Sequence, residues 1–329
     1  MQLIVCGVTI IHSLAKIRGR LALSLLLFVL FFGFLLKNPP LATQSVTDGL
    51  RLCAESLIPS LFPMIVLNGL LLRSPLPYYA SRVLEKPMKR LFALNGACAF
   101  PLVSGCLSGF PLGVKNAVSL YKQGAIDREQ AERVVCFCNN VSPAFALFAV
   151  GGRFFGEVRV GAILYACQLV SALLCGIFLG RGKKSGCDQP LASNAKRISC
   201  PDTPLFGVLS GAISEAGGTL LTISAFAVFF RLLCDMLKAV FTPLALSDAF
   251  SVLACGFLEI TCGCVEASQL GENGIALAAL IFGWSSLSVH MQAAAFLLPE
   301  GLSMKRYLLS KSAQSLLTFF AVLWAIGNF

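Results

Sequence analysis

The sequence predicts an all-α polytopic membrane protein with two inverted-topology repeats, each holding a re-entrant helical hairpin and a broken transmembrane helix. Of its 329 residues, 57% are hydrophobic and 13% are charged, and the mean hydropathy is +0.80. Soluble domains carry about 25% charged residues, whereas uncharged runs of about 20 apolar residues are typical of membrane spans. A helix, a segment rich in helix breakers and a helix broken by polar residues follow one another in the same order in both halves of the chain, which predicts the repeat.

The charge pattern indicates membrane topology. The net charge is +10, and most Lys and Arg residues lie at the ends of apolar runs. No basic patch is interleaved with aromatic residues, so we expect no nucleic-acid partner. Most of the 14 cysteines lie in apolar segments, where we expect reduced thiols that mainly pack.

The first elements precede the repeats. Residues 1–20 are expected to lie in the membrane interface, and residues 21–36 form the first membrane helix. A cleaved signal peptide is the alternative, but no good cleavage site follows. A second helix, residues 50–72, carries Pro59 and Pro63 and is expected to be kinked, and a basic loop, residues 73–90, follows.

Residues 104–143 are the centre of the first repeat. Residues 95–121 contain too many Gly and Pro residues for one spanning helix, so we predict a re-entrant hairpin there. Asp127 and the acidic residues after it suit the positive end of a new helix, which continues through a break at Asn139. A clean helix, residues 158–179, completes the repeat. The predicted divisions are an N-terminal segment with the first helix, the first repeat, a cytoplasmic linker and the second repeat, at residues 1–37, 50–180, 181–204 and 205–329.

The second repeat shows the same order of elements. A helix with Glu215 and a Gly-Gly pair corresponds to the kinked helix, and residues 251–274 correspond to the hairpin. Residues 275–298 correspond to the broken helix, with Ser285-Ser286-x-Ser288 in the place of Asn139-Asn140-x-Ser142. A cytoplasmic N-terminus puts most of the 26 basic residues in inner loops, among them Lys305, Arg306 and Lys311. Seven spanning helices result, and the two repeats then have opposite orientations.

Several strings resemble a known family: SLIPSLFPMIVLNGLL, SGFPLGVKNAVSLYKQGAIDREQAERVVCFCNNVSPAF, GFLEIT and FGWSSLSVHMQ. They are similar to the sporulation integral membrane proteins usually called the YlbJ family, within the wider group that carries the nucleoside-recognition or Gate domain. The resemblance covers about residues 50–325. It implies a fold similar to concentrative nucleoside transporters and a role in moving dipicolinate across the membrane around the forespore. The GWSS string departs from the Gly-Gly break expected there, which leaves the substrate open.

The first group of candidate substrate-binding residues lies in the first repeat. The tip of the first hairpin, residues 108–113, is expected to direct the unpaired backbone N–H groups of a half-helix at a central cavity. Its small residues would equally suit close packing of helices. Lys115 either contacts the solute or extends its amine to the membrane surface. The polar residues before Pro143 either bind the solute or join helices. This group is Ser108, Gly109, Pro111, Gly113, Lys115, Asn139, Asn140 and Ser142.

The second group of candidate substrate-binding residues lies in the second repeat and is expected to form the opposite wall of the solute site. Glu259 is expected to have a partner, or to bind a proton or cation that couples transport, because a buried carboxylate is costly. His290 is either a coupling residue or a hydrogen-bonding one. Glu215 and Glu55 are further candidates. This group is Glu259, Thr261, Ser285, Ser286, Ser288, His290 and Gln292.

The sequence favours a transporter of a small, anionic solute that works by alternating access at a midplane site. No catalytic motif is present, so we expect no enzyme and no resident cofactor. The pairs Cys136/Cys138 and Cys262/Cys264 suggest a metal permease, but C-x-C is a weak signature, and we predict no metal site. The sequence is also compatible with a nucleoside permease or with a non-transporting scaffold for spore envelope assembly. The expected partners are the solute and the lipid bilayer, and oligomerisation is left open.

Overall fold

The computed structural model describes residues 22, 25–26, 28–181, 205–241 and 247–327, and these form helices and connecting segments without any strand. The chain forms two compact units, Met1–Thr47 and Asp48–Phe329. In the first unit, the described residues include a short apolar helix, Phe28–Lys37. The interfacial segment predicted at residues 1–20 and most of the linker predicted at 181–204 lie outside the described residues, so that domain division stays a prediction.

The second unit begins within a long helical stretch. Helix α2 (Pro39–Leu52), a π-helical turn (Cys53–Leu57) and α3 (Ile58–Leu72) follow one another without a gap. The π turn directly precedes the two prolines predicted to kink this helix, and such turns often accommodate missing backbone hydrogen bonds. The segment predicted as a basic loop instead forms two short helices, α4 (Leu76–Val83) and α5 (Glu85–Phe92). Helix α5 has apolar side chains along one face, and Met88 and Phe92 on that face are buried.

The predicted hairpin of the first repeat is present as α6 (Ala99–Ser108) packed against α7 (Leu112–Lys122). The predicted broken helix follows as α8 (Arg128–Cys138) and a π-helical segment, η3 (Phe145–Phe154), separated by the Asn-Asn segment. Asp127 begins α8, because its side chain accepts a hydrogen bond of 2.8 Å from Gln130 N. Helix α9 (Val158–Gly180) then extends through 23 residues, as predicted.

Corresponding breaks occur in the second half. After α11 (Leu205–Phe241), a helical hairpin forms from α12 (Asp248–Leu258) and α13 (Ile260–Ser268), with the break at Glu259. Helices α14 (Glu272–Trp284) and α15 (Ser286–Leu297) are separated at Ser285, where the backbone has a φ of 73°. Helix α16 (Lys305–Gly327) ends the described chain. Both predicted segments therefore form helical hairpins and both predicted helix breaks are present, while re-entry of the hairpins into the membrane stays a prediction.

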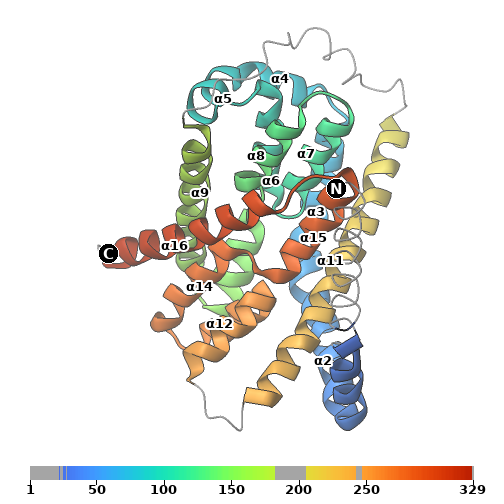
Figure 1. Cartoon of the computed structure of the whole chain (residues 1–329), viewed down its shortest axis with the longest axis vertical. Coiled ribbons are helices and arrows are strands. Elements are labelled where there is room, and N and C mark those ends of the chain that lie inside the picture. The colour runs from blue at the N-terminus through green and yellow to red at the C-terminus, as the bar shows by residue number, and fades with distance from the viewer. Residues whose placement is uncertain (1–21, 23–24, 27, 182–204, 242–246, 328–329) are drawn as a thin grey trace, which may run out of the picture. The chain divides into compact units, whose positions relative to one another are not determined.

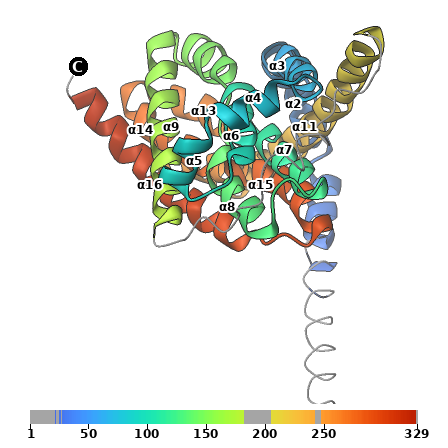
Figure 2. The same ribbon diagram turned by 90° about the horizontal axis from the view of Figure 1, so that it is seen from above.

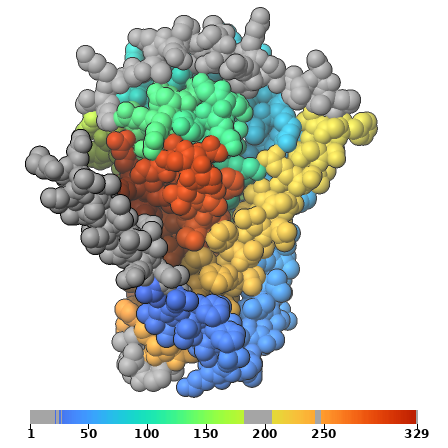
Figure 3. Space-filling view, turned by 45° about the vertical axis from the view of Figure 1, so that its right-hand side comes forward, coloured from blue at the N-terminus to red at the C-terminus, as the bar shows by residue number. Residues whose placement is uncertain are grey.

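The helices of the second unit form two outer groups around these broken elements (Figures 1 and 2). On one side α3 packs against α11, and on the other α16 packs against α9 and α14. The two hairpins and α15 lie between the groups (Figure 2). On the face shown in Figure 3, α11 (yellow) lies against the red-orange C-terminal segments, in agreement with the contact between α11 and α15.

In the described part, five helices are long and apolar enough to cross a membrane, or six if the pair bent by 95° at residues 93–95 counts as one span. The sequence predicted seven. The difference lies in residues 21–36, which are described only in part, and in the α8–η3 helix, whose two halves are each too short to span alone.

Candidate functional site

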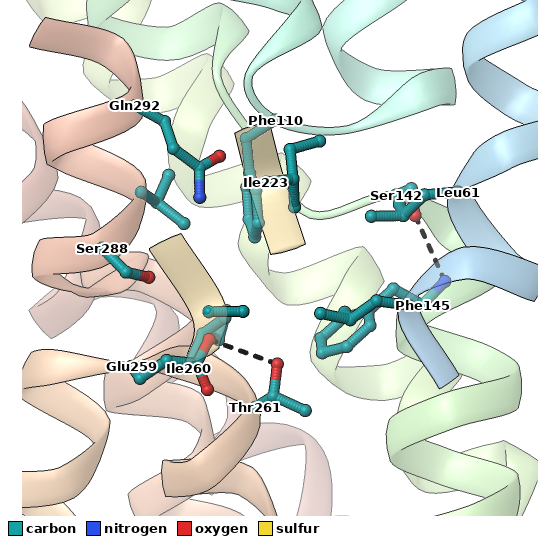
Figure 4. A pocket seen from close by; sticks show the side chains of 13 residues that line it. Leu61, Phe110, Ser142, Phe145, Ile223, Glu259, Ile260, Thr261, Ser288 and Gln292 are labelled. Carbon is teal, nitrogen blue, oxygen red and sulfur yellow. Dashed lines mark hydrogen bonds between the residues drawn. The ribbon is translucent and has the colours of Figure 1, made fainter. Parts of the chain in front are cut away.

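A small buried cavity lies where the hairpin tips and the helix breaks come together (Figure 4). Its volume is about 20 Å³, which is room for about one water molecule. Drug-sized ligands occupy pockets of roughly 300–1,000 Å³, so this conformation is closed. The lining residues are Leu57, Leu61, Phe110, Ser142, Phe145, Ile223, Ala227, Glu259, Ile260, Thr261, Ser288, Val289 and Gln292.

Glu259 supplies the carboxylate of the cavity. It is 3% exposed and lies at the break between α12 and α13. Its Oε2 accepts a hydrogen bond of 2.7 Å from Cys262 N, and its Oε1 accepts one of 3.3 Å from Thr261 Oγ1. The positive end of α13 therefore stabilises a charge at Glu259. Within the described residues this carboxylate forms no ion pair, so it is left to interact with whatever enters the cavity.

Gln292 and Ser288 line the cavity from one face of α15, because residues four apart lie one above the other on a helix. The Gln292 amide points into the cavity (Figure 4). The residue is 4% exposed, and its buried Oε1 has no hydrogen-bond partner in the described structure. Buried polar groups are rarely left without a partner, so this amide marks a place for a ligand or a water molecule.

The first hairpin meets the first helix break at Ser142. Gly109 at the hairpin tip has a φ of 80°, and a Cβ atom there would lie 2.8 Å from Ser142 N. Ser142 lines the cavity, and its Oγ accepts a hydrogen bond of 3.2 Å from Phe145 N. Of the tip, only Phe110 reaches the cavity lining. The predicted tip residues Ser108, Pro111 and Gly113 are buried beside it.

Lys115 does not line the cavity. Its Nζ lies 2.6 Å from Glu215 Oε1 and donates a hydrogen bond of 3.1 Å to Thr219 on α11. Arg73 at the end of α3 binds the other oxygen of Glu215 at 2.8 Å. Lys115 thus forms an ion pair in this structure, and both the solute contact and the membrane-surface position stay predictions. Glu55, the other further candidate, is paired with Arg153.

Asn139 and Asn140 also lie outside the cavity lining. Asn139 Nδ2 donates to the Tyr307 hydroxyl at 2.9 Å, and Asn140 Nδ2 donates to the Phe137 carbonyl at 2.8 Å. The Asn140 Oδ1 accepts a hydrogen bond of 3.0 Å from Gln314 on α16. These contacts are those expected of residues that join helices, and a direct role in solute binding stays a prediction.

The remaining predicted residues surround the second break. Ser285 Oγ donates to the Phe282 carbonyl at 3.3 Å, and the hydroxyls of Ser286 and Ser288 are 3.1 Å apart. His290 Nδ1 lies 3.1 Å from the Tyr307 hydroxyl, while its Nε2 is buried without a partner in the described structure. Tyr307 therefore connects the polar residues of the two breaks.

Sequence reasoning missed a buried polar stripe on α16, formed by Tyr307, Lys311, Gln314 and Thr318. Lys311 was predicted in an inner loop, and this is wrong: it is 0% exposed, inside the helix. Charge alone does not distinguish a loop lysine from a buried one. The spacing of the four residues does indicate a shared helix face, because residues i, i+4, i+7 and i+11 lie on the same side of a helix.

The described cysteines agree with packing roles. None of the eleven described cysteines forms a disulfide bond. Nowhere in the described ranges do three or more His, Cys, Asp or Glu side chains gather in a way that could hold a metal ion. The cysteine pairs at 136/138 and 262/264 thus find no further ligands there.

Comparisons with known proteins agree with the resemblance seen in the sequence. Residues 54–158 match the family model of the Gate domain, described as nucleoside recognition. The chain is 26% identical over 352 aligned positions to the sporulation integral membrane protein YlbJ of Bacillus subtilis, covering 95% of this chain and 84% of that protein. It is also 26% identical to the uncharacterized membrane protein YvoD of the same organism, over 54% of each chain. No solved structure matches significantly.

These similarities and the apolar helices together identify an integral membrane protein. Its residues 54–158 match the Gate family model, and it is similar to a sporulation membrane protein over nearly its whole length.

Proposed function

We propose that this protein transports a small anionic solute through the cavity at Glu259 and Gln292. The observation that carries the proposal is the meeting of both hairpins and both broken helices around one closed, partly polar cavity. Paired broken helices at a central site are typical of secondary transporters with inverted repeats. Two repeats of opposite orientation, similar in fold to concentrative nucleoside transporters, would expose this cavity alternately to the two sides of the membrane.

The closed volume requires the cavity to widen during transport. Phe110, Ile223 and Val289 form part of its apolar lining, and movement of the first hairpin away from α11 would enlarge it. The ion pairs of Lys115 and Arg73 with Glu215 connect that hairpin and α3 to α11, and they would have to break in such a movement. Opening of the cavity on this side would then leave the side chains of Lys115 and Arg73 facing an incoming anion.

Glu259 restricts how an anion can bind. Two like charges in a low-dielectric cavity repel one another strongly. An anionic solute would therefore share the cavity with Glu259 only while this carboxylate carries a proton or a bound cation. This requirement would couple solute movement to an ion gradient, with Glu259 as the coupling group.

Dipicolinate is the solute that the family resemblance implies, in the membrane around the developing forespore. Its two carboxylates and ring nitrogen are hydrogen-bond acceptors, which suit the hydroxyls of Ser142 and Ser288 and the amide N–H of Gln292. A nucleoside is the second candidate, because the Gate model is described as nucleoside recognition and covers residues 54–158. The amide of Gln292 could also pair with a base edge.

Uptake by purified protein in liposomes tests the proposal. We expect labelled dipicolinate to enter protein-containing vesicles faster than empty ones, and excess unlabelled dipicolinate to compete. Nucleosides and divalent metals are assayed in parallel. Saturable nucleoside uptake without dipicolinate uptake would favour the second candidate. No uptake of any solute by folded protein would favour a scaffold in spore envelope assembly.

A further inference from the structure

We infer that the ammonium group of Lys311 is a built-in cation at the carbonyl end of half-helix α8, where ion-coupled transporters bind sodium at comparable helix breaks. The inference rests on the proposed function only for its consequence in transport. The site itself is defined by the contact of Lys311 with the first broken helix and by a hydrogen-bond network through Gln314 and Gln168 that reaches the second.

Lys311 is a buried charge without an acidic partner. It is 0% exposed, and in the part of the chain that the structure describes no carboxylate pairs with it. Its Nζ donates instead to the Asn139 carbonyl and, at 2.8 Å, to Gln314 Oε1. An unpaired charge in a membrane interior is costly and usually functional, so these oxygens must compensate for the lost water.

The end of α8 supplies the negative potential. Pro143 has no N–H group, so the Asn139 carbonyl lacks the hydrogen bond that a continuing helix would give it. The Cys136 and Phe137 carbonyls of the same turn accept hydrogen bonds from Ser310 and Asn140. The C-terminal end of a helix carries a partial negative charge, and a cation there is stabilised. Lys311 thus pairs with a helix end in place of a carboxylate.

The same network reaches the second break. Gln314 Nε2, next to the ammonium group, donates to Asn140 Oδ1 and, at 3.3 Å, to the Gln168 carbonyl. The Gln168 side chain accepts from Val141 N at 3.3 Å and donates to the Phe282 carbonyl, near the end of α14, at 2.8 Å. The position of Lys311 is therefore fixed relative to the C-terminal ends of both half-helices.

This arrangement has a consequence for energy coupling. The ammonium group is held by oxygen atoms, which are also the ligands of alkali cations at broken helices. A sodium ion bound there could leave with the solute, whereas a lysine remains attached. Sodium therefore does not couple transport at this break, and the coupling ion acts elsewhere.

Chemical rescue of a lysine variant tests the inference with purified full-length protein. Lys311→Ala removes three carbon atoms and the amine, which n-propylammonium replaces. We expect Lys311→Ala to unfold at a lower temperature than the wild type, and n-propylammonium chloride to restore most of the difference. The neutral analogue n-propanol should restore little. Sodium chloride should stabilise this variant more than choline chloride does, because the freed oxygens can bind sodium.

Lys305→Ala is the matched control, because Lys305 is exposed on the same helix. It should keep the wild-type unfolding temperature and show no rescue. An unchanged unfolding temperature in Lys311→Ala would overturn the inference. It would also be overturned if n-propanol restored as much stability as n-propylammonium does, or if neither n-propylammonium nor sodium restored any. If Lys311→Ala folds only when purified with n-propylammonium, the inference is supported, and failure to fold even then counts against it. Because unfolding is measured without solute, this result is independent of the uptake assay.

Discussion

At the scale of single residues, the cavity combines one carboxylate with side chains that can donate hydrogen bonds. Glu259 is held by Cys262 N and Thr261, and the Oε1 atom of the Gln292 amide is left without a partner within the described structure. An anion can use the amide but is repelled by the carboxylate. The two residues therefore have separable roles, one in coupling and one in binding.

Replacing Glu259 by Gln tests the coupling role. The amide keeps an oxygen that can accept from Cys262 N, so the α13 cap survives, while the charge is removed. We expect exchange of labelled for unlabelled solute across liposomes to stay near the wild-type rate. Accumulation driven by a proton or cation gradient should fall to simple equilibration. Glu272→Gln, a change at an exposed acid, is the control. Gradient-driven accumulation that persists in Glu259→Gln would refute the coupling role.

Three polar residues of the cavity could be predicted because they lie at or close to helix breaks that are visible in the sequence. Ser142, Glu259 and Ser288 follow or interrupt apolar runs next to Pro, Gly or other polar residues. Lys311 could not be found by the same reasoning, since it lies in an unbroken apolar helix. Its burial depends on packing against the Asn139 carbonyl, 172 positions away in the chain.

At the scale of elements, the first hairpin is held by close backbone contact. A Cβ atom built at Gly105 would overlap the Cys138 carbonyl oxygen, and so would one at Gly113. Two glycines on the hairpin thus allow α6 and α7 to lie directly against the end of α8. This supports the packing interpretation of the small residues at the tip.

We predict that Gly105→Ala destabilises the protein by about 1–3 kcal/mol, because the added methyl group forces the hairpin away from α8. Unfolding of the purified protein in denaturant measures the change. Gly217→Ala is the control, since this exposed glycine on α11 has no atom within 4 Å of an added Cβ. The control should be neutral or slightly stabilising. Equal stability of the two variants would show that the hairpin is not closely packed.

Hairpins and breaks could be predicted because Gly, Pro and Asn act locally on the backbone. The short helices α4 and α5 were missed, since their basic residues suggested a loop while an apolar face was overlooked. The ion pair of Lys115 with Glu215 could not be predicted, because it joins residues 100 positions apart. Such contacts depend on how the two halves of the chain pack.

At the scale of the whole molecule, the two halves each supply a hairpin and a broken helix to one central region. The α3–α11 group and the α9–α14–α16 group lie on either side of it (Figure 2). The polytopic helical class followed from hydropathy alone, which depends only on local composition. The opposite orientation of the halves and the alternate opening of the cavity are proposals about the protein in a bilayer.

The central claim is that the cavity binds the transported solute, and calorimetric titration of dipicolinate into purified variants tests it most directly. Gln292→Ala removes the amide that points into the cavity, while Met291→Ala changes an adjacent exposed side chain on the same helix. We expect Gln292→Ala to bind roughly tenfold more weakly than the wild type, because a lost hydrogen bond of about 1.4 kcal/mol has that effect. Met291→Ala should bind like the wild type. Wild-type affinity in Gln292→Ala, or an equal loss in both variants, would contradict the claim.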